Sequence, residues 1–89
     1  MNDKNNQQPL LETFTVGWCP HCVRLKEFLA RAGLVAVDHD VDVDDEAWQR
    51  MLRLTGGVDI VPVVQIGAAS RHGAFDAAFA TWIRQQVEG

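Results

Sequence analysis

The sequence predicts an α/β domain with the element order β-α-β-α-β-β-α. Short runs rich in β-branched residues alternate with longer segments in which apolar residues recur at helical spacing. The 89 residues are 47% hydrophobic and 22% charged and contain no internal repeat, which is typical of one small globular domain. We expect the polar, amide-rich residues 1–9 to form a disordered tail and residues 10–89 to form the domain.

The first strand and the first helix flank the two cysteines of the sequence. Residues 11–16 mix β-branched and aromatic side chains, as strands do, and end at Gly17. A helix is predicted to run from Pro20, which suits a first helical turn, to Gly33, which suits a helix end. Its expected apolar stripe comprises Val23, Leu25, Phe28, Leu29 and Ala32.

The middle of the chain predicts a second strand and a second helix. Valine or histidine alternates with alanine or aspartate over residues 35–44, a period of two that indicates a half-exposed strand. Acidic residues 44–46 then place negative charge at the start of a helix that Gly56 and Gly57 end. Its expected apolar positions are Ala47, Trp48, Met51, Leu52 and Leu54.

The last part of the chain predicts two strands and a closing helix. Residues 58–66 form an apolar, β-branched run that Pro62 interrupts. Residues 67–70 supply a turn, and a short strand is expected near Arg71. We expect Gly73 to open the last helix, with an inner stripe of Phe75, Ala78, Phe79, Trp82, Ile83 and Val87.

Charge and composition argue against two classes of partner. Twelve acidic residues against eight basic ones give a net charge of −4, and no cluster of lysine and arginine offers the basic face that nucleic acid requires. No stretch approaches the length of a transmembrane helix, and the amino terminus lacks the apolar run of a secretory signal. We therefore expect no nucleic-acid or membrane partner and a cytoplasmic location.

The stretch Gly17-Trp18-Cys19-Pro20-His21-Cys22 carries the clearest chemical signal. Paired thiols in a reducing compartment are more often catalytic or metal-binding than structural. Cys19 is expected at a helix amino terminus, whose unpaired N–H groups and dipole favour a thiolate, so it is the expected nucleophile. Cys22, one turn later on the same side, is the expected resolving thiol. His21 is expected to tune the thiolate when protonated; a solvated histidine without a role is the alternative.

Metal binding is the weaker interpretation of the same residues. The two cysteines supply two of the four ligands that zinc needs, and His21, His39 and His72 do not have the spacing of further ligands. The acidic segment 38–46 lacks the glycine and glutamate positions of a calcium loop. We expect no metal and no tightly bound cofactor.

Three segments in this order resemble the glutaredoxins: Trp18-Cys19-Pro20-His21-Cys22, Val61-Pro62 and Gly73-Ala74-Phe75-Asp76. The resemblance covers roughly residues 11–87. It implies a thioredoxin-like fold, a four-stranded mixed sheet with three flanking helices, in which Pro62 is cis and faces the cysteines. It also implies thiol–disulfide oxidoreductase activity, with a low-molecular-weight thiol as co-substrate and disulfide-containing or thiolated proteins as substrates.

The resemblance also implies roles for residues outside the cysteine motif. The backbone of Val61 would pair with the cysteinyl part of a thiol tripeptide as an added strand does. The Phe75 N–H and the Asp76 carboxylate would hold the γ-glutamyl end. The alternatives are that Val61 and Pro62 only end a strand and that Asp76 is a first-turn acid which interacts with its own helix dipole.

Two positions depart from the glutaredoxin pattern. Many members that use glutathione carry a lysine where this chain has Val16, and an arginine or lysine where it has Asp59. The missing positive charge leaves open whether the thiol is glutathione, mycothiol or bacillithiol; the length of residues 55–62 and Trp18 resemble the mycoredoxins, which use mycothiol. The alternatives are a redoxin that a thioredoxin reductase or similar disulfide reductase regenerates for one protein partner, and a [2Fe–2S] cluster carrier.

Overall fold

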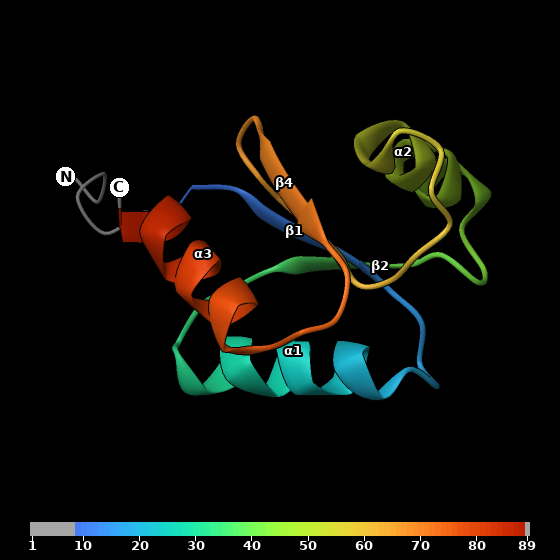
Figure 1. Ribbon diagram of the computed structural model, residues 1–89. Helices are drawn as coiled ribbons and strands as arrows, with labels where there is room; N and C mark the ends of the chain where they lie inside the picture. Colours follow the sequence, from blue (N-terminus) through green and yellow to red (C-terminus); the bar gives the residue numbers. More distant parts are fainter. Residues whose placement is uncertain (1–8, 89) are drawn as a thin grey trace, which may run out of the picture.

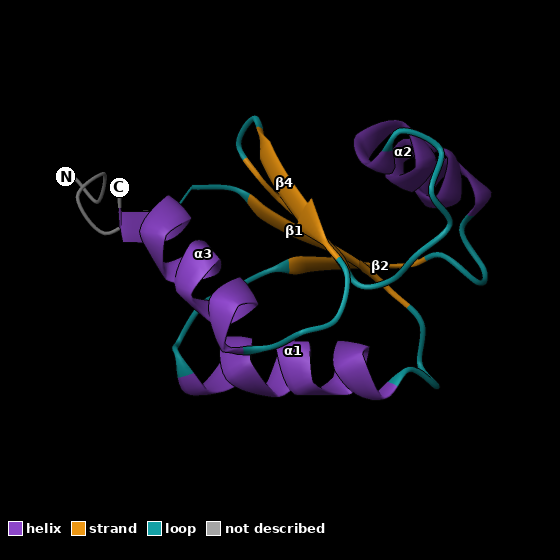
Figure 2. Cartoon of the chain, viewed as in Figure 1, coloured by secondary structure: helices purple, strands orange, loops and turns teal. Residues whose placement is uncertain are grey.

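In the computed structural model, which describes residues 9–88, helices cover both faces of a four-stranded sheet (Figures 1 and 2). The elements follow the predicted order. They are β1 (Leu11–Thr15), α1 (Pro20–Arg31), β2 (Val37–Asp40), α2 (Asp45–Thr55), β3 (Val63–Ile66), β4 (Ala69–His72) and α3 (Ala77–Glu88). Apart from Pro9, the predicted tail of residues 1–9 lies outside the described residues, as does residue 89.

The sheet is mixed, with the strand order β2-β1-β3-β4. The central strand β1 pairs parallel with β2, which places Phe14 opposite His39. On its other side β1 pairs antiparallel with β3, which places Phe14 opposite Val63, and β3 pairs antiparallel with β4. This arrangement, flanked by three helices, confirms the predicted thioredoxin-like fold class.

Strand alternation divides the core between the two faces of the sheet. Successive residues of a strand point to opposite faces, so the neighbours Val63 and Val64 belong to different clusters. Figure 1 shows α2 on one face and α1 and α3 on the other. The cluster that packs against α2 also takes in Cys22 from the start of α1; it contains Phe14, Val16, Cys19, Cys22, Val41, Ala47, Met51 and Val63. The cluster on the other face contains Leu11, Leu25, Leu29, Val64, Ile66, Phe79 and Ile83.

Local signals account for the ends of the second and third helices. Asp44 caps α2 by accepting a hydrogen bond from the Ala47 N–H at 3.1 Å. Gly56 ends the same helix in the left-handed conformation, with φ of 73°, which a glycine adopts without steric cost. At the start of α3, Asp76 Oδ1 accepts from the Phe79 N–H at 2.9 Å. The last helix therefore begins at Ala77, and the prediction that Gly73 opens it is wrong.

Three strand boundaries also differ from the prediction. The second strand has four residues, β2, because the chain turns toward α2 after Asp40, whose Oδ1 accepts from the Asp42 N–H at 3.0 Å. The third begins only after Pro62, which cannot donate a ladder hydrogen bond. The fourth begins at Ala69, inside the predicted turn, because a two-residue connection with Gly67 at a φ of 60° suffices.

The helices bury or half-bury most of the predicted stripes, but the predicted Ala78 of α3 is exposed. In α1 the buried face is Cys22, Leu25 and Leu29, whereas the predicted Val23 is 45% exposed. In α2 the buried residues are Ala47, Met51 and Thr55. None of the helices within residues 9–88 is long and apolar enough to cross a membrane.

Candidate active site

Cys19 stands directly before α1 and caps its amino terminus. Its backbone is extended, with φ of −91° and ψ of 120°, and its Sγ accepts a hydrogen bond from the Cys22 N–H at 3.4 Å. Pro20 occupies the first helical turn, where its missing N–H costs nothing. The N–H groups and the dipole at this helix end favour negative charge on the Cys19 sulfur.

Cys22 has the same side chain in a different environment. It is fully buried, while Cys19 is 7% exposed, and both are free thiols. The pKa of Cys22 is raised from 9.0 to about 12, chiefly by burial; a hydrogen bond from the Val16 backbone acts to lower it, and the neighbouring Cys19 acts to raise it. Cys22 is therefore a neutral thiol at neutral pH, one helical turn from the more accessible sulfur.

His21 links the start of α1 to the loop before α3. Its Nδ1 accepts a hydrogen bond from the Phe75 N–H at 3.1 Å and lies 2.8 Å from Arg24 Nη2, which can only donate. An imidazole that accepts at Nδ1 carries its one proton on Nε2 and is uncharged. A proton on Nδ1 would be incompatible with both contacts. The role of His21 in tuning the Cys19 thiolate stays a prediction.

Val61 and Pro62 lie directly before β3. The Val61–Pro62 peptide bond is cis, and Pro62 is buried. Val61 packs against the cluster that contains both cysteines. Its backbone makes no hydrogen bond to any residue between 9 and 88, so its N–H and C=O are available to an added strand.

Phe75 and Asp76 already have partners within the chain. The Phe75 N–H, predicted to hold a ligand, donates to His21 Nδ1. Asp76 is exposed, and its Oδ1 caps α3 through the Phe79 N–H. The helix-end role that stood as the alternative for Asp76 is thus present, while its role and that of Phe75 in thiol binding stay predictions.

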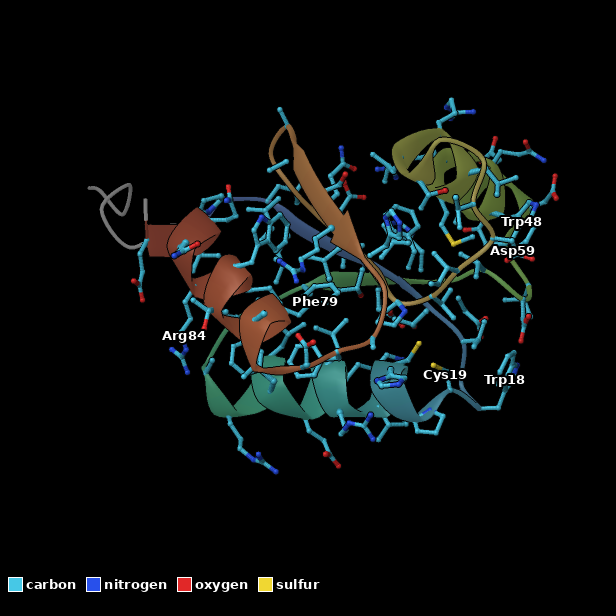
Figure 3. All side chains as sticks on the ribbon, viewed as in Figure 1. Trp18, Cys19, Trp48, Asp59, Phe79 and Arg84 are labelled. Carbon is cyan, nitrogen blue, oxygen red and sulfur yellow. The ribbon has the colours of Figure 1, made fainter. Side chains whose placement is uncertain are left out.

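The structure also forms a pocket that the sequence analysis missed. It has a volume of about 370 Å³ and is lined by Val16, Trp18, Val41, Asp42, Trp48, Asp59, Ile60 and Val61. Figure 3 shows Trp18 next to Cys19 at the start of α1, with Trp48 and Asp59 at the same end of the molecule on α2 and the loop after it. The one sequence signal was indirect, since Val16 and Asp59 stood out as departures in charge.

A metal centre finds no support in the described part of the chain. Between residues 9 and 88, no three histidine, cysteine, aspartate or glutamate side chains are grouped so that they could hold a metal ion.

Comparison with known proteins identifies the family. The sequence matches the glutaredoxin family over residues 11–69. Among solved structures, the thioredoxin-like protein BC3987 is 28% identical, with 85% of this chain and 97% of that chain covered and a TM-score of 0.72. The glutaredoxin from Archaeoglobus fulgidus is 21% identical, with 100% and 97% covered and a TM-score of 0.74. Wheat glutaredoxin is 20% identical, with 90% and 76% covered and a TM-score of 0.66.

A search of curated proteins finds no match. The family match spans well over half of the chain, and the fold agrees with that of the solved glutaredoxins. Together with the neighbouring thiols of Cys19 and Cys22, these findings show that the chain belongs to the glutaredoxin family and is a thiol–disulfide oxidoreductase.

Proposed function

We propose that the protein reduces mixed disulfides and protein disulfides through Cys19 and Cys22, with a low-molecular-weight thiol as co-substrate. The observation that carries the proposal is the contrast between the two sulfurs. Cys19 keeps 7% of its surface exposed and its sulfur accepts a hydrogen bond from a backbone N–H at a helix amino terminus, whereas Cys22 is fully buried and has a raised pKa. The Cys19 sulfur is suited to attack as a thiolate, and the Cys22 sulfur is suited to remain a neutral thiol until a disulfide forms on Cys19.

The reaction begins when the Cys19 thiolate attacks one sulfur of a substrate disulfide. A bond forms between Cys19 and that sulfur, the substrate S–S bond breaks, and the leaving thiolate takes up a proton. The backbone of Val61, which makes no hydrogen bond within residues 9–88 and precedes the cis Pro62, would hold the bound half of the substrate as an added strand.

Two routes can then release the product from Cys19. In the first, the thiolate of a free low-molecular-weight thiol attacks the adduct and restores the Cys19 thiolate. In the second, Cys22 loses its proton and attacks Cys19, which forms the intramolecular disulfide and expels the second substrate thiol. Two thiol molecules then return this disulfide to the dithiol form. We propose that the first route dominates, because the raised pKa of Cys22 leaves little thiolate at neutral pH.

The co-substrate is glutathione, mycothiol or bacillithiol. Regeneration by a protein disulfide reductase is the second candidate, and one observation favours it. Val16 and Asp59, where positive charge would help bind a ligand carboxylate, both line the pocket beside Cys19 and supply none. Either route requires a reducing compartment, and we propose the cytoplasm.

Single-cysteine variants test the proposal directly, because the chain has only two cysteines. Cys19→Ser should lose all turnover of a mixed disulfide; measurable turnover would refute the assignment. Cys22→Ser should retain substantial turnover when the thiol route operates. Its adducts with glutathione, mycothiol and bacillithiol can be followed by intact mass, together with the rate at which each thiol removes its own adduct.

The rates at which the thiols remove their adducts distinguish the low-molecular-weight thiol route from regeneration by a protein reductase. Fast removal by one thiol alone would identify the co-substrate. Slow removal by all three thiols would contradict the low-molecular-weight thiol route and favour regeneration by a reductase, which a reductase-coupled assay of the unmodified dithiol protein would then confirm.

A further inference from the structure

The pocket beside Cys19 has the composition of a binding site for a particular kind of side chain. Most of its lining is apolar, and the two indole rings of Trp18 and Trp48 contribute to it. Its polar side chains are the carboxylates of Asp42 and Asp59, and no lysine or arginine among the described residues lines it. Its volume of about 370 Å³ lies within the range of about 300 to 1,000 Å³ that is usual for ligand pockets.

The pocket is continuous with the cysteine site. Trp18 immediately precedes Cys19, and Val61 immediately precedes the cis Pro62. Val16 and the other buried valine of the lining, Val41, belong to the same hydrophobic cluster as both cysteines, and Trp48 and Val61 pack against that cluster. When Cys19 attacks a substrate disulfide, the substrate polypeptide on one side of that disulfide would therefore pass over this pocket.

The charges at the pocket favour a cation. Asp42 Oδ2 accepts a hydrogen bond from Trp18 Nε1 at 2.9 Å, which holds a tryptophan that is 74% exposed at the pocket rim. Asp59 is exposed and forms no hydrogen bond or ion pair with any residue between 9 and 88. Unneutralised carboxylates raise the local concentration of cations and repel anions, and indole faces attract cations as well.

We propose that this pocket binds the side chain of a lysine or arginine that neighbours the reactive cysteine of a protein disulfide. The aliphatic stem would contact the apolar lining, and the cationic group would meet Asp59 and Asp42 at the rim. A carboxylate at the same place would be disfavoured. This inference rests on the proposed function and adds to it the substrate class, a basic protein segment rather than an acidic thiol.

Matched peptide disulfides test the inference. Three peptides each contain one cysteine and differ only in the residue next to it, which is lysine, glutamine or glutamate. Each peptide is joined through its cysteine to 2-mercaptoethanol by a disulfide. The second-order rate constant for a single turnover of each peptide by the reduced protein is measured without any co-substrate thiol. We expect the lysine peptide to react roughly tenfold faster than the glutamate peptide at low ionic strength, the glutamine peptide to lie between them, and the ratio to shrink with added salt.

A pair of charge variants localises the effect. Asp59→Asn should lower the lysine-to-glutamate rate ratio several-fold, while Glu27→Gln, on the exposed surface of α1 and outside the pocket, makes the same change in net charge and should leave the ratio nearly unchanged. Equal rates for the three peptides, or equal effects of the two variants, would overturn the inference. Failure of the uncharged glutamine peptide to react would instead overturn the proposed function and the inference with it.

Discussion

Cys19 and Cys22 differ in burial and in hydrogen bonding, and this difference links the redox chemistry to stability. A buried thiol is stable in the fold as long as it stays neutral. Burial raises the pKa of Cys22 from 9.0 to about 12, so the unfolded chain loses this proton at lower pH than the folded chain. The contribution of the neutral thiol to stability is thus complete below about pH 9 and is lost as the pH rises toward 12.

This linkage predicts a measurable loss of stability in alkali. Between pH 8 and pH 10, the reduced protein should lose about 1.4 kcal/mol more free energy of unfolding than Cys22→Ser. Urea denaturation at the two pH values, with a reductant present, gives the difference. Cys19→Ser keeps the buried thiol and should show the same loss as the unmodified protein. Equal pH dependence in all three proteins would contradict the raised pKa of Cys22.

At the scale of the elements, the start of α3 gives Asp76 two separable roles. Its Oδ1 caps the helix through the Phe79 N–H, and the resemblance to glutaredoxins assigns its charge to thiol binding. Asparagine can accept the same hydrogen bond without the charge, whereas alanine can do neither. The loop before this helix is further held by the contact between His21 Nδ1 and the Phe75 N–H.

We therefore expect Asp76→Ala to lower the free energy of unfolding by about 1 kcal/mol. For a domain of this size the midpoint of thermal unfolding would fall by about 4 to 8 °C. Asp76→Asn should unfold close to the unmodified protein. If the carboxylate also binds the thiol, both variants should raise the KM for the co-substrate thiol, and Asp76→Asn should do so without losing stability. A large loss of stability in the asparagine variant would show that capping is not what Asp76 contributes.

At the scale of the whole molecule, one polar network fastens α2 to the sheet. Glu12 on β1 accepts two hydrogen bonds from Arg50 of α2, each 3.1 Å long, and lies 2.9 Å from His39 Nε2 of β2. Arg50 also donates to Gln65 of β3 at 3.0 Å and lies over the ring of Phe14. Three strands and one helix therefore meet around the pair of Glu12 and Arg50, and the Glu12 side chain is only 15% exposed.

The hydrogen bonds from Arg50, followed by that with His39, lower the pKa of Glu12 below its ordinary value of 4.5. Its contribution to stability is complete above that pH and is lost as the pH falls through the lowered value. Glu12→Gln should reduce the free energy of unfolding at pH 7 by about 2 kcal/mol, because the variant leaves Arg50 with a weaker partner. Urea denaturation at pH 7 and pH 3 should show this difference shrinking in acid, with Glu27→Gln as the surface control. An undiminished difference at pH 3 would exclude the ionised carboxylate as its source.

Local signals made a large part of this fold predictable. The element order, the capping of α2 between Asp44 and Gly56, and the position of Cys19 at a helix start all follow from patterns a few residues long. The start of α3 was misplaced for the same reason: Gly73 looked like a helix opening, but the hydrogen-bonding cap is Asp76.

By itself, the sequence determined the fold class and the presence of a redox pair, because periodicity, caps and the cysteine spacing act over one or two helical turns. Only the tertiary structure decided three features of the site. The burial of Cys22 depends on the packing of α1 against the sheet, the hydrogen bond at His21 Nδ1 depends on Phe75, 54 residues away, and the acidic pocket collects side chains from several segments. Each depends on contacts between residues distant in the chain, which no local pattern encodes.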